Sequence, residues 1–580
     1  MMWDFYVPKE LFFQLSVAFV LLFQVFGDKT KFKISRLDVL ILSGLTLPGL
    51  ISVCHGQVSI EALRIPFYTA FFYILVQSLS YVDRISFYNY VRQALSGFFV
   101  VGIMMAVYGL LQAFDLDFLH SQGVVAFGPK VIGTIGHANA FASYLAIVFP
   151  MGLAIYSPSQ SRIYKYMILI GLLLIVATLL LTNSRGAWLA LIISLFIFHY
   201  PRIKNMWIRV FKRRLLMISA LMVLILPGIL LFYLVFNMNP ASVKGRFFVW
   251  RIARLMIKKN PLSGIGFQRF PVEYLNYQAK FFDNPLHSQF FYNAANMKQA
   301  DNEYLQVFAE NGFLGLLLSV LIIITLILYI RRLMMITDTD HHRLITSIGT
   351  ALTVILIHSF VDNPLRNLPI MIIFLFSAGL LSMITKFEVN KRYTTIEFRH
   401  SFMLKGLILM FLCYNIFFVI IKGRAYIDWR RGYALVQSGK LPDGIALYEK
   451  AMKKLPETGE LLFQLGSAYA YTHDSEKALP YLEQAKATFN DKNIYISEGL
   501  CYYRLRDFHN AQKSLSKTLR MYPNLLLPRL WLAEIYLQTG QEDDAVRLLH
   551  EIIEIQPKDY SKDTIIIKHD AKQLLSRIIE

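Results

Sequence analysis

Arginine side chains stand at two places where an anion could bind. Arg185 lies in the turn LLLTNSRGAW (179–188), between two apolar stretches with almost no connecting loop. A charge at that depth is costly unless it reaches the interface or meets an anion. Three more arginines open the stretch GRFFVWRIARLMIKK: Arg246, Arg251 and Arg254. Planar guanidinium groups hold phosphate oxygens two at a time, so both places could bind a phosphorylated ligand.

Each arginine site also has a simpler interpretation. Arg185 could anchor a helix end at the membrane interface. Read as a helix, the second stretch places Arg251 and Arg254 on one face with apolar residues between them. Such an amphipathic helix could lie on lipid headgroups. An Asn-Pro pair directly after the stretch should end the helix.

Acidic and histidine side chains follow later in the chain. Asp301 precedes a predicted helix, Tyr304–Glu310, which an Asn-Gly pair should end. Asp301 could cap this helix, or its carboxylate could take a proton from an attacking hydroxyl. The segment HSFVDNPLRN (358–367) puts His358 and Asp362 one helical turn apart, so a hydrogen bond between them is possible.

The segment GTIGHANAFA (133–142) is predicted to form a tight entry into a closely packed helix. Its His137 could belong to a site, or it could be a capping or interface histidine. The residues expected to support the chemistry are His137, Asn139, Asn302 and Asp362. The sequence contains no metal-ligand spacing, phosphate-binding loop, dinucleotide fingerprint or nucleophile elbow, so we expect no metal and no cofactor.

The elements that must position these residues are membrane helices. Of the 580 residues, 55% are hydrophobic, and the mean hydropathy is +0.45, which is typical of a multi-pass membrane protein. About twelve apolar runs approach the roughly 20 residues that span a bilayer. The predicted spans are 9–26, 38–54, 66–80, 97–114, 138–156, 166–182, 185–200, 214–236, 313–330, 344–361, 368–385 and 402–421.

Charge assigns the sides of the membrane. The net charge of +20 comes largely from basic residues in alternate short loops, the densest between Arg202 and Arg214, so nucleic acid is not needed to explain it. The positive-inside rule makes those loops cytoplasmic. The Arg185 turn, the long loop 237–312, the N-terminus and the C-terminal domain would then face outward, which in a bacterial inner membrane is the periplasm.

The C-terminal region is an internal repeat. Gly432, Gly466, Gly499 and Ala533 recur at about 33–34 residues, the tetratricopeptide period. Further along each unit come Tyr448, Leu482, Leu515 and Leu549, whose side chains should fill the gap between its two helices. We predict an all-α protein: a membrane domain over 1–422 and a tetratricopeptide solenoid over 423–580, with a capping helix at 563–579. Such arrays usually bind a protein partner, and the alternative is a stability or assembly module.

The motifs together resemble the O-antigen ligase superfamily, over roughly residues 130–385. The motifs that carry the resemblance are the TNSRG turn, R-x-x-x-W, N-P-x-x-G-x-G-F, NEYLQVFAENG and HSFVDNPLRN. The superfamily includes lipid A-core ligases, O-antigen polymerases and bacterial protein O-oligosaccharyltransferases, some with a tetratricopeptide tail.

The resemblance implies a glycosyltransferase that moves a preassembled glycan from undecaprenyl diphosphate to an acceptor hydroxyl, without metal. The family's essential arginines map onto Arg185 and Arg246, which would bind the donor diphosphate with Arg251 and Arg254. The family's proposed histidine base is replaced here by Asp301, and an aspartate is a weak base at its ordinary pKa of about 3.9 unless burial raises it. The histidines that could take the role instead are His358, His137 and His287.

Several functions remain open from sequence. The acceptor could be a protein Ser/Thr, lipid A-core, or another lipid-linked glycan, as in a polymerase. A membrane scaffold whose repeats recruit envelope proteins is an alternative of another class. Transport is disfavoured because few ionisable residues lie in mid-span.

Overall fold

The chain folds as two compact units. The computed structural model describes residues 7–25, 29–54, 56, 64–78, 83–117, 131–156, 160–210, 240–336, 339–389, 394–399, 402–556 and 561–579. We call Met1–Val243 with Ala300–Phe417 the membrane unit, and Lys244–Gln299 with Phe418–Glu580 the solenoid unit. The predicted all-α class is confirmed, with one short two-stranded ladder in addition.

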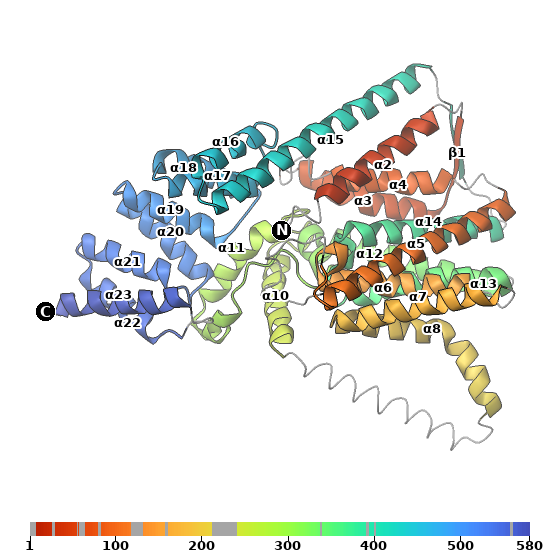
Figure 1. Ribbon diagram of the computed structural model, residues 1–580, viewed down its shortest axis with the longest axis horizontal. Helices are drawn as coiled ribbons and strands as arrows, with labels where there is room; N and C mark the ends of the chain where they lie inside the picture. The colour runs from red at the N-terminus through yellow and green to blue at the C-terminus, as the bar shows by residue number, and fades with distance from the viewer. Residues whose placement is uncertain are drawn as a thin grey trace. The chain divides into compact units, whose positions relative to one another are not determined.

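The membrane unit is a bundle of apolar helices (Figure 1). They are α2 (Val7–Val25), α3 (Arg36–Cys54), α4 (Arg64–Ser78), α5 (Arg84–Ala113), η3 (Gly133–Ile135), α6 (Ala138–Ile155), α7 (Arg162–Leu181), α8 (Arg185–Val210), α12 (Glu303–Ile336), α13 (Thr339–His358), η5 (Pro364–Arg366), α14 (Leu368–Glu388) and the first part of α15 (Phe402–Gln437).

The chain is a multi-pass membrane protein. Among the described residues, 6 helices are long and apolar enough to span a membrane, and these are α3, α5, α6, α7, α12 and α14. Arg185–His199 in α8 is a shorter apolar segment. The predicted span 214–236 lies outside the described residues, so the count of about twelve stays a prediction.

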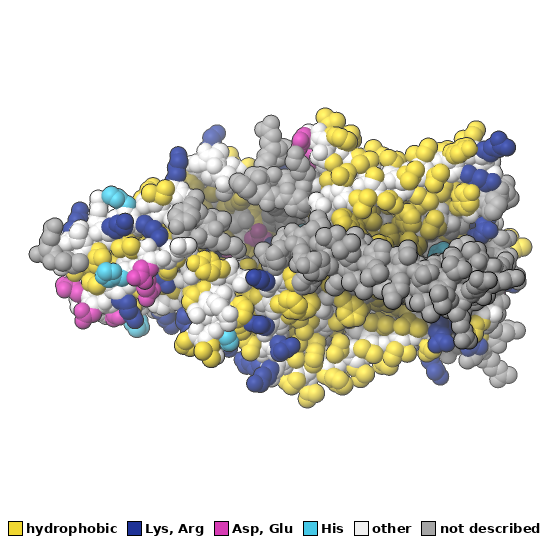
Figure 2. Space-filling model, turned by 90° about the horizontal axis from the view of Figure 1, so that it is seen from below, with side chains coloured by type: hydrophobic (Ala, Val, Ile, Leu, Met, Phe, Trp, Pro, Cys, Tyr) yellow, Lys and Arg dark blue, Asp and Glu magenta, His cyan; other side chains and the backbone are white. Residues whose placement is uncertain are grey.

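Burial separates central helices from lipid-facing ones. In α6 and α14, 78% of the 18-residue apolar stretch is buried, whereas in α12 only 11% of the corresponding stretch is buried. Small residues let helices approach α6: a Cβ on Gly102 of α5 would lie 2.6 Å from Val148 of α6. Figure 2 shows hydrophobic side chains over much of the flank of this unit, as expected of a surface that faces lipid.

One end of the membrane unit carries the strand ladder. Strand β1 (Lys29–Ile34) pairs antiparallel with β2 (Thr394–Arg399), which puts two segments with basic residues on the same side of the bundle. Lys386 lies 2.7 Å from Asp38, and both side chains are almost fully buried. Lys386, near the end of α14, therefore belongs to a buried ion pair.

The solenoid unit combines the repeats with part of the loop predicted over 237–312. Its helices are α10 (Pro240–Lys259, within the unit from Lys244), α11 (Phe270–Phe282), η4 (Pro285–Asn293), the end of α15, α16 (Leu441–Met452), α17 (Gly459–Tyr471), α18 (Ser475–Ala485), α19 (Lys492–Arg504), α20 (Phe508–Met521), α21 (Leu527–Gln538), α22 (Glu542–Glu554) and α23 (Lys562–Ile579). As predicted, α10 ends directly before Asn260-Pro261.

The repeat pairs are built as the period predicts. An ideal Cβ on Gly432 would lie 2.9 Å from Tyr448, and one on Gly466 would lie 2.9 Å from Leu482. The corresponding distance from Gly499 to Leu515 is 2.7 Å. The small residue in the first helix of each of these pairs therefore makes room for the large one in the second. Helix α23 packs on α22 and caps the array.

Candidate functional site

The TNSRG turn is a tight connection between two membrane helices. Helix α7 ends at Leu181 and α8 begins at Arg185, with Asn183 in the left-handed region at φ 56°. Asparagine tolerates that conformation better than most residues. The indole N–H of Trp188 donates to the Leu179 carbonyl at 2.8 Å and fixes the turn.

Arg185 occupies the first turn of α8 and is partly exposed. That turn contains no acidic residue. A cation at a helix N-terminus is unfavourable with respect to the helix dipole, whereas an anion there is stabilised by the free N–H groups. The guanidinium and the helix end therefore favour the same kind of ligand, an anion.

Gly186 brings this turn against His358. An ideal Cβ on Gly186 would lie 2.9 Å from His358 Nε2 and 2.8 Å from Val361 Cγ2, so a larger residue would displace the imidazole. His358 is 2% exposed, and its Nδ1 lies 2.5 Å from Ser143 Oγ. Sequence analysis did not single out Ser143, because a serine inside an apolar helix carries no signal of its own.

The predicted pair of His358 and Asp362 is close but not directly hydrogen bonded. The distance from His358 Nε2 to Asp362 Oδ2 is 4.0 Å, beyond hydrogen-bond length. The other Asp362 oxygen accepts the Asn363 backbone N–H at 2.7 Å. The sequence separation correctly put the two groups together, but the turn directs one carboxylate oxygen to its own backbone.

Asn302, rather than Asp301, caps helix α12. The Asn302 side chain accepts the Leu305 backbone N–H at 2.9 Å, so the capping role considered for Asp301 is wrong. Asp301 precedes the cap in the left-handed region at φ 49° and is partly exposed. The Asp301 carboxylate is therefore not the N-cap of α12.

The start of α12 is joined to the end of α13 by consecutive hydrogen bonds. They run from Asn302 Nδ2 to Phe360 O (2.9 Å), from the Glu303 N–H to Ser359 O (2.9 Å), and from Tyr304 OH to Leu356 O (2.7 Å). Asp301 and His358 are thereby held in one region of the membrane unit. Helix α12 continues into the next span. The helix end predicted at the Asn-Gly pair is present only as one non-helical residue, Gly312 (φ 63°).

Arg366 holds this region together. Its guanidinium lies 3.3 Å from Glu303 and 2.7 Å from Glu310, whose side chains are 9% and 0% exposed. Burial disfavours the charge, but Glu310 and Glu303 more than offset this and raise the pKa of Arg366. Sequence analysis missed this triad. The two glutamates lie seven residues apart on one helix face, but only the fold reveals their partner.

His137 and Asn139 lie at the entry of α6. The glycine turn is as predicted, since Gly133 and Gly136 have positive φ. His137 is the N-cap residue of α6 but makes no side-chain capping hydrogen bond, and it is exposed. Asn139 is partly exposed and lies one turn before Ser143. Both belong to the same end of α6 as the Ser143–His358 pair.

The other predicted arginines belong to the solenoid unit. Arg251 and Arg254 are exposed on α10, whereas Met256, on the opposite face, is 0% exposed, so the predicted amphipathic helix is confirmed. The Arg251 guanidinium lies 4.4 Å from the Phe290 ring centroid. Arg246 is partly exposed one turn before Trp250.

His287, considered as an alternative base, packs in an aromatic cluster beside α11. Its ring stacks on Phe281 with centroids 3.8 Å apart, and its Nδ1 lies 2.6 Å from the Phe281 carbonyl oxygen. Since the carbonyl is an acceptor, Nδ1 carries the proton. These contacts account for His287 as a packing residue.

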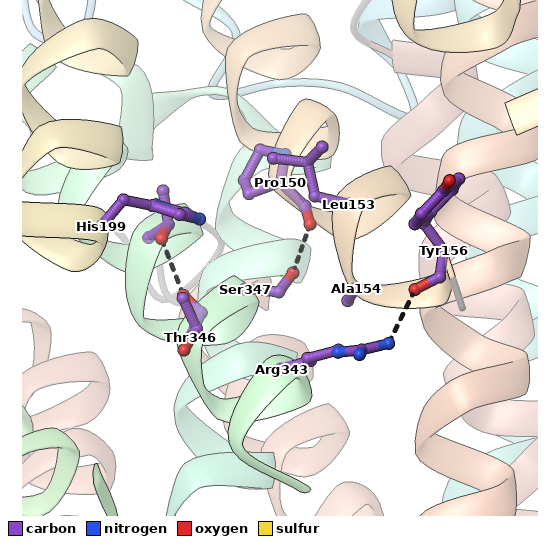
Figure 3. Close-up of a pocket in the computed structure, with 9 residues that line it drawn as sticks. Pro150, Leu153, Ala154, Tyr156, His199, Arg343, Thr346 and Ser347 are labelled. Carbon is purple, nitrogen blue, oxygen red and sulfur yellow. Dashed lines mark hydrogen bonds between the residues drawn. The ribbon is translucent and has the colours of Figure 1, made fainter. Parts of the chain in front are cut away.

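A cavity of about 240 Å³ lies elsewhere in the membrane unit, between α6, α8 and α13 (Figure 3). Arg343 lines it and donates to the Tyr156 carbonyl at 3.2 Å, and Ser347 donates to the Pro150 carbonyl at 2.8 Å. None of the residues predicted for the site lines this cavity.

Comparison with known families agrees with this architecture. Residues 170–320 match the O-antigen ligase family. Residues 430–492 and 502–562 match two tetratricopeptide repeat families. The mouse protein "Tetratricopeptide repeat protein 21B" is 27% identical over 124 residues, which cover 20% of this chain and 9% of that protein. That likeness concerns a small part of either protein.

The protein is thus a multi-pass membrane protein with a helical repeat domain. More particularly, it carries an O-antigen ligase domain followed by tetratricopeptide repeats. The resemblance inferred from its motifs is confirmed over residues 170–320 and in the repeats.

Proposed function

We propose that this protein transfers a preassembled glycan from undecaprenyl diphosphate to an acceptor hydroxyl on the periplasmic side of a bacterial inner membrane. The observation that carries the proposal is the packing of the Arg185 turn against His358 in the membrane unit. The start of α12, with Asp301, is joined to the same end of α13. The turn that carries Arg185 and the start of α12 that carries Asp301 therefore both contact the end of α13 and the turn after it. Arg185 and Asp301 also lie within residues 170–320, which match the O-antigen ligase family.

The arginines would act on the leaving group. Arg185 and Arg246 bind the diphosphate, with Arg251 and Arg254 supplying further positive charge. As the bond between the anomeric carbon and the phosphate oxygen breaks, negative charge grows on that oxygen, and guanidinium groups already in place stabilise it.

The acceptor hydroxyl must lose a proton as its oxygen bonds to the anomeric carbon. We assign this proton to Asp301, which is partly exposed and not used as a helix cap. His358 is the second candidate, but it is 2% exposed and its Nδ1 is engaged by Ser143. An acceptor reaches a partly exposed carboxylate more readily than a buried imidazole. The products are the glycosylated acceptor and undecaprenyl diphosphate.

Loss of the protein should remove one glycoconjugate from the cell. The informative comparison is the lipopolysaccharide ladder, the glycoproteins and the capsule of a disrupted strain against those of the parent. Loss of the ladder indicates a lipid A-core acceptor, and loss of glycoproteins indicates Ser/Thr. Chains that stay attached but become shorter indicate a polymerase. No change in any of the three would refute the proposal.

The proposed sides of the membrane are tested by a reporter fused after residue 424, which should report the periplasm. The pairing of β1 with β2 supports the assignment, since it places the loops around 29–36 and 386–399 on one side. A cytoplasmic signal would reverse every side assigned here.

Replacing the proposed base should stop turnover without stopping donor binding. We expect Asp301→Asn to lower the turnover rate by about 10²–10⁴-fold, since asparagine cannot accept the proton. Asp115 is a matched control, because it is another aspartate of the membrane unit with positive φ (61°). Asp115→Asn should leave turnover unchanged. Full turnover in Asp301→Asn would transfer the role to a histidine.

A further inference from the structure

The repeats have a binding partner within their own chain. Segment 270–296, which contains α11 and η4, packs in the solenoid unit against α20 and against residues just before α19 and just after α22. We infer that this face of the repeats is a docking surface for the chain's own loop. Docking there sets the position of the α10 arginines and hence the affinity for a polyprenyl diphosphate. This inference deepens the proposed function and rests on it for the identity of the ligand.

Buried amides make the central contacts. Gln278 is 0% exposed, and its Nε2 donates to the Met521 carbonyl at 2.8 Å. Asn490 is 5% exposed and donates to the Val272 carbonyl at 2.7 Å. Each amide satisfies a main-chain carbonyl across the contact, so removing either leaves an unpaired polar group away from water.

Polar contacts at the edge extend the same surface. Asn296 Nδ2 donates to the Asn490 carbonyl at 3.2 Å and to Asp491 Oδ2 at 2.8 Å. Arg520 binds both oxygens of Asp283, at 2.9 and 2.6 Å. The hydroxyl of Tyr292 donates to the Gln556 carbonyl at 3.0 Å. The segment is therefore fixed from α11 to just past η4, rather than at one point.

An aromatic cluster connects the docked segment to the arginine helix. Phe248 of α10 lies 5.6 Å from Phe281 and 5.7 Å from Phe282 of α11, between ring centroids. Phe290 of η4 contacts Phe248 and carries the Arg251 guanidinium over its ring. Packed rings transmit a shift of α11 to α10, because a close-packed interior does not deform freely.

The docking contacts join segments that lie far apart in the sequence. The repeats follow the last predicted span, yet they contact a segment more than two hundred residues earlier, as in the pair Gln278 and Met521. A module that only recruited an external protein would not need these buried contacts with segment 270–296 of its own chain.

The test uses the full-length protein in membranes and two measurements. The first is hydrogen exchange of segment 270–296, and the second is the affinity for undecaprenyl diphosphate itself. In Gln278→Leu/Asn490→Leu, exchange should rise roughly tenfold or more because two buried hydrogen bonds are lost. Binding of undecaprenyl diphosphate should weaken, while exchange in α6 and α13 should not change.

A charge exchange supplies the matched control. Arg520→Glu and Asp283→Lys should each weaken docking, and the double variant should restore it. Arg547 and Asp544 form a similarly exposed pair, at 2.7 Å, wholly within the α22 region. Arg547→Glu should leave both measurements unchanged, since that pair does not touch the loop.

The outcomes separate this inference from the proposed function. Unchanged exchange in the buried double variant, or faster exchange with unchanged lipid affinity, would overturn the inference. If the wild type binds undecaprenyl diphosphate but transfers no glycan, the proposed function fails. Weaker binding in the variants would then still support docking. If the wild type does not bind the lipid, both fail.

Discussion

Arg185→Ala and Arg246→Ala should each reduce glycan transfer by about a thousandfold or more. The expected size follows from the loss of a guanidinium that stabilises a leaving phosphate oxygen. Arg185 stands in the first turn of α8, and that turn contains no acidic residue. Both variants should insert normally, because Arg185 is the first residue of its apolar segment and Arg246 lies outside the predicted spans. The measurement is glycan attachment in cells that contain equal amounts of each variant in the membrane.

Conservative and distant substitutions sharpen this result. Arg185→Lys keeps the positive charge but cannot make bidentate hydrogen bonds to a phosphate, so intermediate activity is expected. Arg162 is an exposed arginine at the opposite end of α7 from the turn, and Arg162→Ala should be fully active. Normal attachment in both alanine variants would remove the enzyme hypothesis and favour a membrane scaffold, for which the arginines are dispensable.

Arg366→Met should destabilise the membrane unit by about 3–5 kcal/mol, the usual cost of removing one partner of a buried ion pair. The substitution leaves Glu303 and Glu310 without their cation in a region where they are 9% and 0% exposed. The start of α12 should then detach from the turn after α13. Thermal unfolding in detergent measures the loss, and transfer should fall with it, because Asp301 is held by the same contacts.

The comparison for Arg366 is another arginine of the same unit. Arg84 pairs with Glu388 at 2.7 Å but is 52% exposed, and Tyr88 also donates to Glu388. Arg84→Met should therefore cost less than about 1 kcal/mol. Adding Glu310→Gln to Arg366→Met should recover part of the lost stability, since it removes one of the two buried carboxylates that have lost their cation. A stable single variant would show that the triad does not hold α12.

The alternatives left open by sequence differ in what they require of the site. A ligase and a polymerase both need the arginines and the base, so they differ only in the acceptor. A scaffold needs neither. The docked loop adds a constraint on all of them, since it assigns one face of the repeats to the chain itself. A protein partner would have to use another face or displace segment 270–296.

Local patterns in the sequence determined much of this protein. The apolar runs predicted membrane helices, and the Asn-Pro pair after α10 predicted where that helix ends. The repeat period predicted small residues where the two helices of a unit approach and large residues that fill the gap, as Gly499 and Leu515 do. These features depend on neighbours a few residues or one repeat apart, so propensity and spacing are sufficient to fix them.

Tertiary structure alone decided which distant groups meet. Ser143 and His358 lie 215 residues apart in the chain, and Arg366 is 56 residues from Glu310. Gln278 and Met521 are 243 residues apart. A single serine, glutamine or arginine carries no local signal of its partner, because burial of a polar group is permitted only once the fold has brought that partner into reach.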